Sequence, residues 1–231
     1  MAGLLKKLEQ IPGLLRLRLS SLEPSDITAE LVEQIIESRI ICPHLHMPLQ
    51  SGDGEILRLM KRHYEPVEYL YLAKWLKQKI PGLALSSDVI VGFPGETEHH
   101  HRRSMALIRD IEFSRLHVFK YSSRPGTQAA DLPDKLSNEI KDNRSKEMIK
   151  LGEEMTSAYR RQFLDTIQPV LVERVVPYSH GEGFTPNYLR VKISSEIKGL
   201  HWRGKEIDAL LKEEAGPHIK AKHIHTRRKH S

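Results

Sequence analysis

The chain has 231 residues, of which 39% are hydrophobic and 29% charged, as is ordinary for a globular protein with one large domain or a domain and an appendage. No apolar run reaches the roughly 18 residues that a membrane span needs. The first residues, MAGLLKKLEQIPG, are too polar for a secretory signal. The single cysteine, Cys42, excludes an internal disulfide and cannot alone hold an iron–sulfur cluster or a structural zinc. We therefore expect a cytoplasmic protein with no membrane partner.

The formal net charge of +6 is concentrated at the C-terminal end of the chain. Residues 215–231 contain no acid and carry five cationic side chains, Lys220, Lys222, Arg227, Arg228 and Lys229, which leaves +1 for residues 1–214. We predict that this segment is a disordered basic tail that either contacts nucleic acid or only keeps the chain soluble.

Short β-rich runs alternate with amphipathic helical patterns in the first part of the chain. The predicted strands are 14–20, 44–50, 84–93 and 115–122, and the predicted helices are 28–38, 53–62, 66–80 and 97–111. The strands start 30 to 40 residues apart, a spacing typical of right-handed βαβ units. The sequence therefore predicts an α/β fold with about four parallel βα units, as in a partial (β/α) barrel or an open doubly wound sheet.

Polar, Gly- and Pro-containing segments follow each of these strands, at 20–24, 50–52, 92–96 and 121–127. The carboxyl ends of parallel strands meet at one edge of the sheet, where α/β proteins bind their ligands. The sequence therefore predicts a ligand site at this edge.

The composition changes after a long helical pattern over 137–164. Arg144 interrupts the apolar face of that helix, and we expect it to extend toward solvent. Short strands are then predicted at 170–176, 187–193 and 206–211. We predict an α/β domain over 1–165, a small all-β domain over 166–214 and the tail over 215–231.

Four sequence segments occur in a characteristic order: RLRLSSLEP, HLHMPLQSGDGEILRLMKR, SSDVIVGFPGET and HVFKYSSRPGTQAADLPD. Because of these segments, the chain resembles the radical S-adenosylmethionine (SAM) methylthiotransferases over about residues 12–193. The nearest branch modifies threonylcarbamoyladenosine beside the tRNA anticodon. The resemblance implies a partial (β/α) barrel, a long helix and a small RNA-contacting β-barrel, the TRAM domain, with tRNA as partner.

The resemblance also implies SAM and [4Fe–4S] clusters as cofactors, the SAM-cleaving cluster being held by a CxxxCxxC loop. This sequence lacks that loop and resembles the latter half of such an enzyme, so we expect no cluster binding, no catalytic residue and no activity by this chain alone. A gene fragment, one half of a split enzyme and a non-catalytic RNA-binding or interaction remnant remain open.

The resemblance places SAM against the carboxyl ends of the strands. Gln50 and Ser51 would contact its ribose and methionine, and Ser20 and Ser21 would offer hydroxyls to the same edge. The adenine would lie against Ile90, Gly92, Val118 and Phe119. Glycine suits such a wall because a ring can approach its backbone closely.

We expect structural roles for the histidines of strand 44–50, for the cysteine and for the HHHRR segment. His44 and His46 share one strand face and are half of a possible metal site. We expect hydrogen-bonded interior histidines and no metal, while a half-barrel metal-dependent hydrolase remains an alternative. We expect Cys42 to be packed and the segment 99–103, HHHRR, to be a solvated surface. Strand 14–20 would leave an open edge, which predicts self-association, pairing with a missing half, or covering by residues 1–11.

Overall fold

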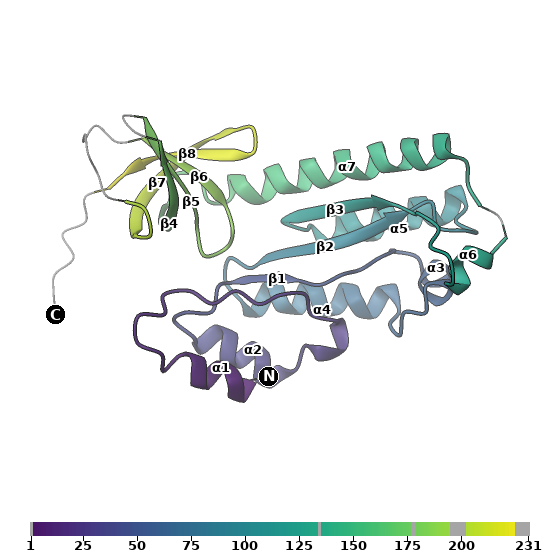
Figure 1. Cartoon of the computed structure of the whole chain (residues 1–231), viewed down its shortest axis with the longest axis horizontal. Coiled ribbons are helices and arrows are strands. Elements are labelled where there is room, and N and C mark those ends of the chain that lie inside the picture. Colours follow the sequence, from purple (N-terminus) through teal and green to yellow (C-terminus); the bar gives the residue numbers. More distant parts are fainter. Residues whose placement is uncertain (1, 134, 177–178, 195–201, 225–231) are drawn as a thin grey trace. The chain divides into compact units, whose positions relative to one another are not determined.

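The computed structural model describes residues 2–133, 135–176, 179–194 and 202–224. The chain divides into two compact units, Met1–Thr156 and Ser157–Ser231. In the first unit the elements are α1 (Ala2–Leu8), a 3-10 turn (Pro24–Asp26), α2 (Ala29–Glu37), β1 (His44–His46), α3 (Gly54–Leu59), α4 (Pro66–Lys79), β2 (Ala84–Val91), α5 (Glu98–Ile111), β3 (Arg115–Lys120), α6 (Gln128–Asp131) and most of α7 (Asn138–Arg161). Figure 1 shows their order along the chain.

The first unit contains a parallel sheet in the order β1-β2-β3, which confirms the predicted α/β class. Its register pairs His46 with Ser86 and Asp88 with His117. The sheet has three strands rather than the predicted four. Residues 14–20 make only an isolated bridge, Leu17 to Ile41, so the prediction of a strand there is wrong.

The pairing of residues 14–20 with the segment before β1 stops after Cys42. The Cys42 N–H donates to the Leu17 carbonyl at 2.8 Å. The next donor, His44 N–H, is directed to the Cys42 carbonyl at 2.7 Å. Near this segment, Leu5 of α1 is buried in the core, and α1 packs along α2. Self-association remains a prediction.

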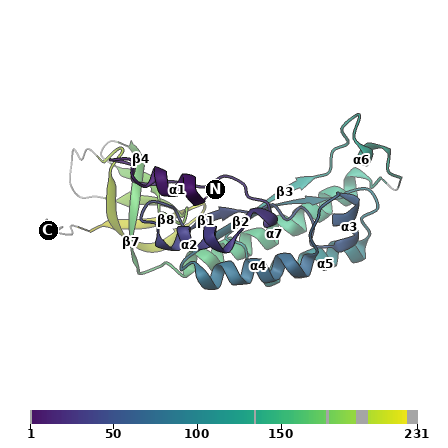
Figure 2. The same cartoon turned by 90° about the horizontal axis from the view of Figure 1, so that it is seen from below.

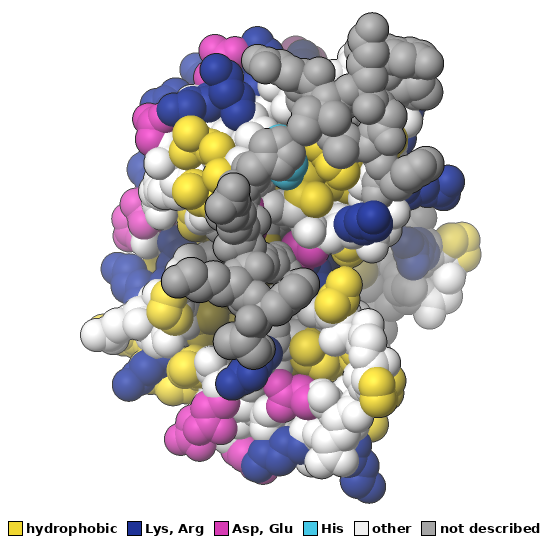
Figure 3. Space-filling model, turned by 90° about the vertical axis from the view of Figure 1, so that its left-hand side faces the viewer, with side chains coloured by type: hydrophobic (Ala, Val, Ile, Leu, Met, Phe, Trp, Pro, Cys, Tyr) yellow, Lys and Arg dark blue, Asp and Glu magenta, His cyan; other side chains and the backbone are white. Residues whose placement is uncertain are grey.

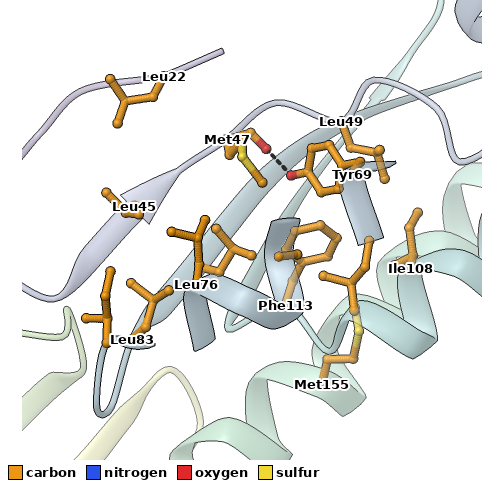
Figure 4. Close-up of a cluster of buried hydrophobic side chains, with 14 of the residues drawn as sticks. Leu22, Leu45, Met47, Leu49, Tyr69, Leu76, Leu83, Ile108, Phe113 and Met155 are labelled. Carbon is orange, nitrogen blue, oxygen red and sulfur yellow. Dashed lines mark hydrogen bonds between the residues drawn. The ribbon is translucent and has the colours of Figure 1, made fainter. Parts of the chain in front are cut away.

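Helices α4, α5 and α7 cover one face of the sheet (Figure 2). The strand residues that point to this face are odd-numbered in β1 and β2, because successive side chains alternate between faces. They join a single core with the helices, formed by Leu45, Met47, Leu85, Val89, Val91, Tyr69, Leu76, Ile108, Phe113, Met148 and Met155 among others. Within this core the Tyr69 hydroxyl donates to the Met47 carbonyl at 2.5 Å (Figure 4).

The second unit contains the last helical turn of α7 and a closed β-barrel. Its strands are β4 (Ile167–Val176), β5 (His180–Phe184), β6 (Arg190–Ser194), β7 (Glu206–Ala215) and β8 (His218–His223), joined in the order β4-β5-β6-β8-β7. The β6–β8 pair is parallel and the others are antiparallel. The long helix and small barrel were predicted, but β5 and β8 were not.

The predicted disordered tail is corrected by β8. Ile219 and Ala221 of β8 are buried in the barrel, while the intervening Lys220 and Lys222 are exposed. The run of basic residues concealed this alternation in the sequence. Residues 225–231 of the predicted tail lie outside the described residues. Among the helices that the structure describes, none has both the length and the apolar character to cross a membrane.

Candidate ligand site on the parallel sheet

The face of the sheet opposite the helices carries the side chains that can bind a ligand. Alternation places on it His44 and His46 of β1, Ser86, Asp88 and Ile90 of β2, and Arg115, His117 and Phe119 of β3. Its amino-terminal half is therefore polar and its carboxyl-terminal half apolar.

Ile90 and Phe119 form the apolar half, since they are paired across β2 and β3. Phe119 is 52% exposed, so its ring is open to a ligand. Val118 points the other way and packs against the hydrophobic core. Of the residues assigned to an adenine wall, the structure thus brings Ile90 and Phe119 together and places Val118 on the helix side. Two consecutive strand residues cannot line the same face.

Gln50 lies beside the carboxyl end of β2. Its N–H donates to the Asp88 carbonyl and its carbonyl accepts from Ile90 N–H, both at 2.8 Å, with a left-handed φ of 64°. Ser51 is buried instead, with its Oγ 3.2 Å from the Oγ of Ser104 in α5. The Ser51 side chain therefore ties the loop to α5, whereas Gln50 stays at the sheet edge. Ser20 is exposed in the segment that precedes the 3-10 turn Pro24–Asp26.

Gly52 explains the close approach of this loop to α5. A Cβ on Gly52 would lie 2.7 Å from the Ser104 Cα, closer than side chains tolerate. The N–H of Gly52 donates to Ser104 Oγ at 3.1 Å. The next residue, Asp53, is fully buried and caps α3 by accepting from the N–H groups of Glu55 and Ile56.

A buried ion pair fixes the loop after β2. Gly92 has a φ of +74°, and its N–H donates to the Glu96 carboxylate. Arg144 of α7 donates through Nη1 to the Glu96 carbonyl at 2.8 Å and to Oε2 at 3.0 Å. Arg144 is 7% exposed, so the prediction that it extends to solvent is wrong. Its partner comes from a loop 48 residues earlier in the chain, which helical periodicity does not reveal.

The polar half of the face brings three potential metal ligands together. His46 Nε2 lies 3.4 Å from Asp88 Oδ2, and the rings of His46 and His117 are 5.9 Å apart. The alternation along the strand pairs His46 with His44, but His44 is more deeply buried and contacts Ser86 Oγ at 3.4 Å through Nε2. Burial, followed by the charges of Arg18 and His46, lowers the pKa of His44 to about 4.

Asp88 and His117 were missed as partners of His46. The signal was present, since Asp88 and His117 are polar residues at alternate positions of two strands predicted to be neighbours. Their register was needed to place them beside each other, and the sequence does not give it.

The HHHRR segment is only partly a solvated surface. His101 is 1% exposed, and its Nε2 lies 2.9 Å from a carboxylate oxygen of Glu147 in α7. His100 Nδ1 accepts from the N–H of Thr97 in the cap of α5. Cys42 is 2% exposed, as expected for a packed thiol.

The residues present do not fit an iron–sulfur cluster. The only thiol in the sequence, Cys42, is buried, and a cluster of this type is held by several thiolates. SAM is a better match, because Ile90 and Phe119 offer an apolar surface to a flat ring beside the polar Gln50. When bound beside a reducing cluster, SAM supplies a radical that abstracts hydrogen.

Comparison with known proteins agrees with the resemblance of the sequence to radical SAM methylthiotransferases. Residues 3–108 match the model of the radical SAM superfamily. The chain is 40% identical over 199 residues to the tRNA-2-methylthio-N(6)-dimethylallyladenosine synthase of Thermodesulfovibrio yellowstonii, covering 84% of this chain and 45% of that protein. It is 38% identical over 195 residues to the threonylcarbamoyladenosine tRNA methylthiotransferase MtaB of Bacillus subtilis, covering 82% and 43%. The chain is homologous to tRNA methylthiotransferases.

The chain spans less than half the length of these two relatives. Among solved structures, Escherichia coli coproporphyrinogen III oxidase, a radical SAM enzyme, matches with a TM-score of 0.55 at 15% identity, covering 92% of this chain and 50% of the other. At that identity the match supports the fold alone.

Proposed function

We propose that this chain is the part of a tRNA methylthiotransferase that holds the adenine of SAM and contacts tRNA. The enzyme it serves adds a 2-methylthio group to N6-threonylcarbamoyladenosine beside the anticodon. The cluster thiolates come from another segment or a partner chain, since Cys42 is the only thiol here. The observation that carries the proposal is the 36–40% identity to tRNA methylthiotransferases over most of the chain.

The SAM-binding part of the proposal rests on the paired Ile90 and Phe119. The adenine stacks on the exposed Phe119 ring and Gln50 lies toward the ribose, whereas Gly92 is buried against Lys141 and is not part of the wall. Ser51 acts indirectly by anchoring this loop to α5.

Ligand-detected NMR with SAM tests this part. We expect saturation transfer to the adenine protons for the wild-type chain and its loss in Phe119→Ala. Tyr71→Ala is the matched control, because Tyr71 is also an exposed aromatic residue of the first unit, 70% exposed on α4. Absence of transfer in the wild-type chain, or equal loss in both variants, would refute the wall.

The RNA-binding part rests on neighbouring strands of the barrel. Lys192 of β6 is paired with Lys220 of β8, and the next outward residue of β8 is Lys222. Acidic side chains moderate this charge, as Lys192 Nζ lies 3.4 Å from Glu182 and Lys220 Nζ 2.6 Å from Glu213. The face of the molecule in Figure 3 also mixes basic with acidic and apolar side chains, so the contact is expected on these strands rather than on one broad basic patch.

Electrophoretic shifts with anticodon stem-loops test RNA binding. We expect the N6-threonylcarbamoyladenosine form to bind more tightly than the N6-dimethylallyladenosine and unmodified forms, with affinity falling as salt rises. The double variant Lys192→Gln and Lys222→Gln should weaken binding, whereas Lys212→Gln on β7 of the same barrel should not. A preference for the dimethylallyl form would reassign the substrate, and no shift at low salt would refute RNA binding.

The alternative of a non-catalytic RNA-binding remnant is favoured by the absence of cluster thiolates. It predicts an RNA shift from a chain that gives no SAM signal. The two measurements together therefore separate the candidates.

A further inference from the structure

The polar half of the open sheet face contains a cluster that SAM or RNA binding does not require. Its members come one from each strand: His46 from β1, Asp88 from β2 and His117 from β3. One ligand atom from each residue lies within 4.8 Å of the others. Within the part of the chain that the structure describes, this group alone meets that criterion.

The distances suit a small, four-coordinate ion. Zn²⁺ binds imidazole nitrogen and carboxylate oxygen at about 2.0–2.2 Å, so two tetrahedral ligands lie about 3.4 Å apart. His46 Nε2 and Asp88 Oδ2 are 3.4 Å apart. His117 is paired directly with Asp88 in the sheet register, which places its side chain on the same face, and its ring centroid lies 5.9 Å from that of His46.

The hydrogen bonds around His46 orient its free nitrogen toward the same point. Ser86 Oγ donates to the Leu45 carbonyl at 3.3 Å, which leaves its oxygen to accept from His46 Nδ1 at 3.0 Å. With the proton on Nδ1, the lone pair of Nε2 faces the Asp88 carboxylate and is available to a metal ion. Metal-bound histidines characteristically use their second nitrogen in this way.

The site is also accessible to an ion. The side chains of His46 and Asp88 are 17% and 30% exposed, so an ion can enter and one coordination position can remain for water. A structural zinc site would instead be closed by a fourth protein ligand.

We propose that His46, Asp88 and His117 bind one divalent transition-metal ion, Zn²⁺ or an ion of similar coordination preference, with Ser86 positioning His46. The donor set of two imidazoles and one carboxylate is the set found in open zinc sites. The site is independent of the thiolates and of SAM.

Zinc titration of the full, chelator-treated chain by calorimetry tests the proposal. We expect one equivalent to bind to the wild-type chain, and replacement of Zn²⁺ by Co²⁺ to give visible absorption typical of four-coordinate cobalt. Asp88→Asn and His117→Ala should abolish both signals. Ser86→Ala should weaken binding on the order of 10- to 100-fold, as for other groups that orient a metal-bound histidine.

The chain has 13 histidines, so adventitious binding needs its own control. His99→Ala removes a histidine beside His100 on α5 and should leave the titration unchanged. Circular dichroism of each variant shows whether it has folded. The zinc stoichiometry of the wild-type chain is measured independently of the variants. Absence of zinc binding by the wild-type chain would overturn the proposal. Binding retained in folded Asp88→Asn, or lost in His99→Ala, would overturn it as well.

Discussion

Replacing Arg144 by methionine is expected to destabilise the first unit strongly. Methionine preserves much of the length and apolar packing of the arginine side chain but removes its charge and donors. The Glu96 carboxylate would then remain buried, at 5% exposure of the residue, with only the Gly92 N–H as a partner among those described here. The loss removes donated bonds of 2.8 and 3.0 Å to Glu96.

The magnitude follows from leaving a buried charge unpaired. Breaking such a pair from one side costs about 3–5 kcal/mol in the free energy of unfolding, because desolvation of the remaining ion is no longer compensated. Replacing both charges costs less, because no ion is left behind. We therefore expect the double variant Arg144→Met and Glu96→Gln to be more stable than Arg144→Met alone.

Urea unfolding followed by circular dichroism measures these differences. Arg102→Met is the matched control, because Arg102 pairs with Glu98 at 2.8 Å on the surface of α5 with 77% of its side chain exposed. An exposed pair contributes about 0–1 kcal/mol. A loss at Arg144 no larger than at Arg102, or no recovery in the double variant, would refute the assignment of this pair as the anchor of the loop.

Three further predictions concern other contacts. Gly92→Ala should cost about 1–3 kcal/mol, because φ is +74° and a Cβ would lie 2.4 Å from Lys141 Cγ; Gly126→Ala, at φ +80° with open space, should cost less in the same urea series. Tyr69→Phe should cost about 1–3 kcal/mol by leaving a buried carbonyl without its donor, and thermal unfolding showing no change would contradict this. The pKa of Glu182 is lowered from 4.5 to about 2, first by its hydrogen bond with a histidine of the same strand. Its stabilisation is therefore present above pH 4.5 and lost as pH falls toward 2, so Glu182→Gln should unfold more easily than wild type at pH 5 and converge with it at acidic pH.

The sequence predicts elements well where local patterns determine them. Thr28 caps α2, Pro66 opens α4, and the helices and strands that were predicted between α2 and β3 lie within a few residues of their predicted limits, whereas α1 and α6 were not predicted. Prediction fails where distant partners decide. Residues 14–20 have an alternating pattern, but the next donor of the neighbouring segment, the His44 N–H, is directed to the Cys42 carbonyl and not to residues 14–20.

The barrel shows the same limit in the other direction. β5 contains Gly181 and Gly183 and has little strand propensity by itself. Gly183 is required there because a Cβ would lie 2.0 Å from the Leu171 carbonyl oxygen of β4. That requirement comes from the pairing partner, so the local sequence reads as a turn.

The two halves of the candidate site depend on one stripe of β2. Ser86, Asp88 and Ile90 are alternate residues on the same face, and successive members of this row lie about 6.6 Å apart along the strand. Ser86 and Asp88 therefore belong to the polar cluster, whereas Ile90 begins the apolar wall. Because the ligands proposed for the two halves contact different side chains, Asp88→Asn can remove zinc without removing the surface on which adenine stacks. If zinc and SAM instead compete for binding, the two sites overlap near Ile90, contrary to what the side-chain chemistry indicates.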